Sequence, residues 1–126
     1  MVRGRMPDHS STVAVITGGA QGLGRAIAET LLAEGCTRLI ISGRNVEKGE
    51  AAAADMRSTR ADVAFLRADM MDVAQAQLLM DRAVQRFGRV TALVNAAAAT
   101  DRGSILDTTP ETWDALMNAN ARGPFF

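Results

Sequence analysis

Eight residues near the start of the chain, from Thr17 to Gly24, read Thr-Gly-Gly-Ala-Gln-Gly-Leu-Gly. A β-branched apolar run, residues 12–17, precedes the glycines and predicts a strand buried on both faces. A helical pattern follows them and ends at Gly35. Such a turn is typical of a pyrophosphate site, because the helix start offers free N–H groups and a positive dipole end to an anion. The alternative is a glycine-rich turn that binds no ligand.

The three glycines of this segment have separable expected roles. Gly18 allows the tight turn off the strand, Gly22 lets the backbone approach a phosphate, and Gly24 lets the helix pack against the sheet. With the preceding Thr17, the spacing Gly-x-x-x-Gly-x-Gly resembles the glycine motif of the short-chain dehydrogenase/reductase family. The resemblance implies a dinucleotide cofactor. Two loop residues are further candidate contacts, Gln21 and Leu23.

A second cofactor determinant is expected about twenty residues beyond the glycine loop. A carboxylate there would bind the ribose 2′-hydroxyl of NAD, whereas an arginine would favour the 2′-phosphate of NADP. The chain reads Ser42-Gly43-Arg44-Asn45, without a carboxylate. Arg44 and Asn45 are therefore candidate cofactor residues, and we expect NADP(H) to be preferred, with NAD(H) possible. The alternative for Arg44 is a solvated turn arginine.

Two residues after the third expected strand, Asp69 and Met70, match the family pattern. The family places an aspartate at this point against the adenine amino group. The resemblance thus makes Asp69 a candidate contact to adenine and Met70 its neighbour in the site. The alternative is an ordinary loop carboxylate.

The segment after the fourth expected strand resembles the family's Asn-Asn-Ala-Gly motif, and its candidate residues are Asn95, Ala96, Ala97 and Ala98. Asn95 and Ala97 match the motif, while Ala96 replaces the second asparagine and Ala98 the glycine. The resemblance implies that Asn95 is buried and ties the central strands together. A methyl group at position 98 would crowd the cofactor ribose if the backbone there needed glycine dihedrals.

The last segment, residues 113–126, resembles the family's fourth helix, and Asn120 falls on the asparagine of the family's catalytic tetrad. That residue is thought to bend the helix and hold a water for proton relay. The alternative is a polar helix residue that faces solvent.

Strand and helix patterns alternate from residue 12 to the end of the chain. They predict an α/β fold: a Rossmann-type doubly wound parallel sheet, incomplete at about four strands, in the order 3-2-1-4. We expect a disordered lead over residues 1–11 and one dinucleotide-binding domain over 12–126. The expected strands are 12–17, 38–42, 62–66 and 90–95, and the expected helix caps are Asn45, Asp72 with Gln75, and Thr109 before Pro110.

Two helices have an expected apolar face. The members at helical spacing are, in the first helix, Leu23, Ala26, Ile27, Thr30 and Leu31, and in the third, Val73, Ala76, Met80, Ala83, Val84 and Phe87.

Composition excludes several classes of partner. The formal net charge is zero and the isoelectric point is near 6.6, so nothing indicates binding to nucleic acid or to an anionic membrane. Cys36 is the single cysteine and is expected to be buried, so neither a disulfide framework nor a metal site is expected. No transmembrane or signal segment is visible, and we expect a cytoplasmic protein. His9, the single histidine, lies in the lead and receives no role.

In the family, the proton for hydride transfer comes from a tyrosine in a Tyr-x-x-x-Lys motif, assisted by a serine. The sequence has no tyrosine, and its one lysine is Lys48. We therefore expect the cofactor-binding half of a short-chain oxidoreductase acting on a small carbonyl or alcohol, truncated before the catalytic residues and inactive alone. The alternative is a non-catalytic dinucleotide-binding or interaction module. An exposed fourth strand predicts a homo-oligomer or association with a completing chain.

Overall fold

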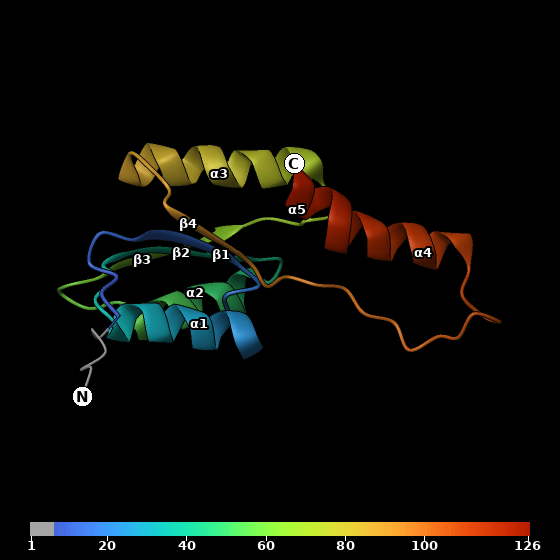
Figure 1. Ribbon diagram of the computed structural model, residues 1–126, viewed down its shortest axis with the longest axis horizontal. Coiled ribbons are helices and arrows are strands. Elements are labelled where there is room, and N and C mark those ends of the chain that lie inside the picture. Colours follow the sequence, from blue (N-terminus) through green and yellow to red (C-terminus); the bar gives the residue numbers. More distant parts are fainter. Residues whose placement is uncertain (1–6) are drawn as a thin grey trace, which may run out of the picture.

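The computed structural model describes residues 7–126, which form alternating strands and helices (Figure 1). The elements are β1 (Val13–Thr17), α1 (Gly22–Ala33), β2 (Arg38–Gly43), α2 (Val46–Met56), β3 (Asp62–Arg67), α3 (Val73–Phe87), β4 (Ala92–Asn95), α4 (Pro110–Met117), the π-helical turn η1 (Asn118–Arg122) and α5 (Gly123–Phe125).

The four strands form one parallel sheet in the order β3-β2-β1-β4, as predicted. Helices α1 and α2 cover one face of this sheet and α3 covers the other (Figure 1). Each face has its own apolar cluster: Ile16, Ile41 and Phe65 pack toward α1 and α2, while Val15 and Ile40 pack toward α3. The order change between β1 and β4 creates the crevice at the carboxyl ends of the strands where ligands bind in open α/β sheets.

The predicted helix caps are confirmed. The Asn45 side chain accepts a hydrogen bond from the Lys48 N–H, Asp72 accepts from Ala74 and Gln75, and Thr109 accepts from Thr112. Asn45 and Thr109 each occupy one of the N–H groups that a helix start leaves unpaired, and Asp72 occupies two. These three helix starts are thus closed by the chain itself.

The expected helix faces are partly wrong. Leu23, Ala26 and Thr30 are exposed, and α1 instead buries Gly24 and Ala28, with Ile27 and Leu31 half-buried. Ala28 packs in the apolar cluster with Ile16 and Ile41 of the sheet, while Gly24 packs against Gly18 and Gly19 of the preceding loop.

In α3 the buried residues are Ala76, Leu79 and Ala83, whereas Val84 is 47% exposed. The expected face of α3 is thus correct except at Val84, since its other members are buried or half-buried. Cys36 is buried, as expected.

The fourth strand is shorter than predicted and begins at Ala92 rather than Val90. It pairs with β1, and within residues 7–126 no strand pairs with its other edge. Its side chains alternate between half-buried and exposed, and Leu93 is 47% exposed. Apolar side chains are also exposed on the last helices, among them Trp113 and Phe125. Association through these surfaces stays a prediction.

The expected disordered lead is wrong for the part that the structure describes. His9 donates its backbone N–H to the Glu34 carbonyl at 2.8 Å, and its ring lies 3.3 Å from the Glu34 carboxylate. Thr12 in turn donates its N–H to the His9 carbonyl. These bonds hold the chain against the end of α1, which sequence periodicity could not reveal. The expectation for residues 1–6 lies outside the described residues.

Across residues 7–126, no helix combines the length and the apolar character needed to cross a membrane.

Candidate functional site

The glycine loop is held between the carboxyl ends of β2 and β4. Gly18 and Gly19 donate their N–H groups to the Ser42 carbonyl, at 2.8 and 3.2 Å. Gly18 has a positive φ of 67°, and a Cβ at this position would lie 2.7 Å from the Ala97 nitrogen. A side chain is thus excluded both by conformation and by space. The predicted role of Gly18 in the tight turn matches this geometry.

Gly24 meets the loop rather than the sheet, since a Cβ there would collide with the Gly18 carbonyl oxygen. The helix start is therefore packed directly onto the preceding turn. This differs from the helix–sheet packing that the sequence suggests. The close approach still requires glycine.

The start of α1 is open, unlike the starts of α2, α3 and α4. Its N-cap residue Gln21 makes no capping hydrogen bond, and α1 has no acidic residue in its first turn. At Gly22, with a φ of 55°, nothing lies within 4 Å of the position that a Cβ would occupy. Unpaired N–H groups and the positive helix end therefore face empty space, which suits the pyrophosphate of a dinucleotide.

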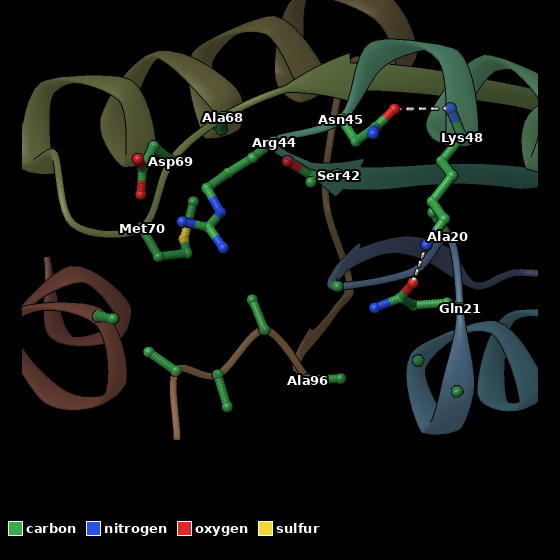
Figure 2. Close-up of a pocket in the computed structure, with 18 of the residues that line it drawn as sticks. Ala20, Gln21, Ser42, Arg44, Asn45, Lys48, Ala68, Asp69, Met70 and Ala96 are labelled. Atoms are coloured by element: carbon green, nitrogen blue, oxygen red, sulfur yellow. Dashed lines mark hydrogen bonds between the residues drawn. The ribbon is translucent and has the colours of Figure 1, made fainter. Parts of the chain in front are cut away.

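This space is the end of a cleft of about 680 Å³ at the carboxyl ends of the strands (Figure 2). Twelve of the thirteen predicted cofactor residues line it: Gly18, Gln21, Gly22, Leu23, Gly24, Arg44, Asn45, Asp69, Met70, Ala96, Ala97 and Ala98. Its walls also include residues that the motifs did not single out, namely Ala20, Ser42, Gly43, Lys48, Ala68, Met71, Ala99 and Ala119. Segments from across the sequence thus converge on one cavity.

Asn95 does not line the cleft. Its side chain is exposed at the edge strand β4, so the expectation that it is buried is wrong. The tie between strand ends is made instead by Thr17, whose buried hydroxyl accepts a hydrogen bond from the Ala97 N–H at 3.2 Å. Thr17 is the first residue of the glycine motif and the last residue of a buried strand. A hydroxyl at that position was the signal in the sequence that could have identified its role.

Ala98 is not strained by its methyl group. No residue other than glycine has a positive φ within residues 7–126, so the backbone at position 98 does not need glycine. The condition under which the methyl group would crowd a ribose, a glycine-like backbone at this position, is therefore not met.

Asp69 lies in a loop that is fixed by the start of α3. Its backbone N–H donates to the Gln75 side-chain oxygen at 3.0 Å, and Gln75 also donates to the cap residue Asp72. The Asp69 carboxylate accepts from the Met71 N–H at 3.0 Å and retains further acceptor capacity. Met70, next to it, is buried. The loop thus presents a carboxylate beside an apolar wall.

Hydrogen bonds from Gln75, first from its side chain and then from its backbone N–H, lower the pKa of Asp72 below its usual value. Asp72 therefore stays ionised near neutral pH, and the cap that holds this loop remains in place.

Asn120 lies in η1, where the helix widens after α4. Its side-chain oxygen accepts from the Ala99 N–H at 2.8 Å, and its side-chain nitrogen donates to the Ala99 carbonyl at 2.7 Å. Asn120 is exposed, as in the alternative of a polar helix residue that faces solvent, but its side chain is hydrogen-bonded to Ala99. Asn120 itself does not line the cleft, but its partner Ala99 and its neighbour Ala119 do.

Arg44 and Lys48 provide the positive charge of the cleft, and Figure 2 shows Arg44 extending into it on the side of Met70. Lys48 extends from α2 toward the glycine loop and donates its ammonium to the Gln21 side-chain oxygen at 2.9 Å (Figure 2). Between them Ser42 is buried, and its hydroxyl has no hydrogen-bond partner within the described part of the chain.

Residues 7–126 contain no cluster of three histidine, cysteine or carboxylate side chains able to hold an ion.

Known proteins are similar to this chain in sequence and in fold over most of its length. A family model described as short chain dehydrogenase matches residues 12–126. The NADP-dependent (R)-specific alcohol dehydrogenase of Lentilactobacillus kefiri is 39% identical over 114 residues, which are 90% of this chain and 44% of that protein. The chain therefore spans less than half the length of this curated relative.

Two solved structures share the fold. The short chain dehydrogenase of Burkholderia cenocepacia in complex with NADP has a TM-score of 0.86 and 30% identity, covering 96% of this chain and 49% of that one. A blue fluorescent protein from a metagenomic library, in complex with NADPH, has a TM-score of 0.85 and 27% identity, with the same coverage. The chain thus corresponds to about half the length of each of these two proteins.

Proposed function

The chain belongs to the short-chain dehydrogenase family, and we propose that its cleft binds NADP(H) in preference to NAD(H). The protein in which this cleft operates would transfer a hydride between the nicotinamide and a small carbonyl or alcohol. The observation that carries the proposal is the open start of α1 at Gly22, in a chain whose other long helices are capped. A dinucleotide pyrophosphate would complete this helix start as the side-chain caps complete the others.

The preference for the 2′-phosphorylated cofactor is supported by the end of β2. Positions 42–45 contain no carboxylate to accept hydrogen bonds from a ribose 2′-hydroxyl, and Arg44 extends into the cleft. A guanidinium binds a phosphate through two parallel hydrogen bonds. The relatives described with NADP or NADPH support the same choice.

The remaining cleft residues would orient the cofactor. Asp69 offers acceptor oxygens at the wall that we assign to the adenine, and Met70 offers an apolar surface beside it. At the opposite wall, Thr17 and Asn120 fix the segment from Ala97 to Ala99 by hydrogen bonds. The bound cofactor would supply or accept the hydride, and these residues would hold it in place.

A second candidate is a dinucleotide-binding module without reductase activity of its own. The sequence contains no tyrosine, and its one lysine is hydrogen-bonded to Gln21 beside the glycine loop. The family's acid–base pair is therefore not formed by these residues. An assay for carbonyl reduction, with the chain alone and with a polypeptide carrying Tyr-x-x-x-Lys, separates the two candidates: activity in the mixture supports a divided enzyme.

The proposed binding can be tested by replacing Gly22 with valine. Gly88→Val is the matched control, because Gly88 also has a positive φ and open space around it but lies at the end of α3. Both variants incur a similar backbone strain of about 1–2 kcal/mol. Only Gly22→Val places a side chain where the pyrophosphate would lie.

We expect Gly22→Val to abolish NADPH binding in a fluorescence or calorimetric titration, while Gly88→Val binds like the wild type. Parallel titration of the wild type with NADH should show weaker binding than with NADPH. Unchanged affinity of Gly22→Val would overturn the assignment of the cleft, and equal affinities for the two cofactors would overturn the preference.

A further inference from the structure

Lys48 occupies a position that helix stability does not explain. It lies in the first turn of α2, three residues after the cap Asn45, and donates its backbone N–H to that cap at 2.9 Å. A positive side chain in the first turn opposes the helix dipole, which favours anions there. An extended lysine side chain also loses rotamer freedom when its ammonium is held in one place. Both costs suggest that the fixed ammonium has another role.

The charge of Lys48 is not neutralised by the chain. Its partner Gln21 is an uncharged amide, so the ammonium keeps its full charge and two of its three donors. Among residues 7–126, only some of the other basic side chains pair with carboxylates: Arg25 with Glu29 and Asp55, Arg57 with Glu50, and Arg86 with Asp62. Among residues 7–126, no carboxylate oxygen lies within 4.0 Å of the nitrogens of Lys48 or Arg44.

Arg44 precedes the cap of α2, Lys48 lies in its first turn, and both line the cleft (Figure 2). Arg44 comes from the end of β2 and makes no hydrogen bond with residues 7–126, whereas Lys48 is fixed against the glycine loop by Gln21. Buried Ser42, with its unpartnered hydroxyl, lines the same part of the wall. Arg44 and the hydrogen-bonded ammonium of Lys48 thus flank the region beyond β2 where no carboxylate is present.

We propose that Lys48 is a second determinant of cofactor choice, and that the dianionic 2′-phosphate of the adenosine binds between Lys48 and Arg44. Gln21 is a positioning residue that holds the ammonium in place without neutralising it. This inference rests on the proposed binding of NADP(H) and adds a residue from α2 to that site. A phosphate dianion with two cations gains charge-assisted hydrogen bonds from both, and a 2′-hydroxyl gains neither.

The test measures dissociation constants of the full chain for NADPH, NADH, adenosine 2′,5′-bisphosphate and 5′-AMP. The variants are Lys48→Met and Arg44→Met, with Arg60→Met as control, since Arg60 lies between α2 and β3 at the opposite ends of the strands. Lys48→Met should weaken NADPH and the bisphosphate about 10-fold or more, and change NADH and 5′-AMP less than about 2-fold. Arg60→Met should change none of them.

If Lys48→Met weakened the binding of NADPH and NADH equally, Lys48 would serve the pyrophosphate and the inference would be overturned. Unchanged affinity for both cofactors would also overturn it. If the wild type binds neither cofactor, the proposed function fails instead. Lys48 is exposed, so thermal unfolding should show that Lys48→Met folds normally.

The role of Gln21 is tested by Gln21→Leu, alone and combined with Lys48→Met. Gln21→Leu should lower the ratio of NADPH to NADH affinity about 3-fold in the wild-type background and leave it unchanged in the Lys48→Met background. A merely structural role of Gln21 would lower both affinities equally in both backgrounds, and would exclude it as a positioning residue.

Discussion

Replacing Asn120 with alanine should release the segment after β4 from the last helix. The wild-type side chain makes two hydrogen bonds to Ala99, of 2.8 and 2.7 Å, which bridge 21 positions of sequence. Each is worth about 0.5–1.5 kcal/mol, and because Asn120 is exposed, water replaces part of that. The expected loss is about 1–2 kcal/mol in total, or about 5–30-fold in the equilibrium for local opening.

Hydrogen exchange of the Ala99 amide measures this opening directly, because that N–H is itself the donor to Asn120. We expect its protection to fall by the same factor in Asn120→Ala. Asn118→Ala is the matched control, since Asn118 lies in the same π-helical turn and its side chain makes no hydrogen bond with residues 7–126. Unchanged protection of Ala99 in Asn120→Ala, or an equal fall in both variants, would refute the reasoning.

Two further predictions concern other ties around the cleft. Thr17→Val keeps the shape but leaves the Ala97 N–H without its partner, so urea unfolding should show a loss of about 1–3 kcal/mol; no loss would mean that this bond is idle. Hydrogen bonds from Gln75, then Ala74, lower the pKa of Asp72, so its stabilising contribution is complete above the usual value of 3.8 and is lost as pH falls through the lowered pKa. Below about pH 4, the free energy of unfolding should therefore fall more steeply with decreasing pH for the wild type than for Asp72→Asn, whose side chain caps the helix but does not titrate. Equal slopes for the two proteins would contradict this.

The sequence determined the architecture because the signals for it are local. Buried β-branched runs fixed the strands, and cap residues such as Asp72 and Thr109 fixed where helices begin. The spacing of Gly18, Gly22 and Gly24 identified the loop at the end of β1, since each glycine is required by its own backbone or its nearest neighbours. The alternation of strands and helices then predicted the strand order.

The tertiary structure decided which side chains meet, and sequence periodicity carries no information about that. Lys48 reaches Gln21 across 27 positions, and Thr17 reaches Ala97 across 80, only because parallel strands bring their carboxyl ends together. Asn95 is exposed because β4 pairs on one side alone within residues 7–126, although its motif implied a buried residue. The sequence by itself thus determined where the cleft would form, whereas the packing of distant elements determined which residues line it and which hold it together.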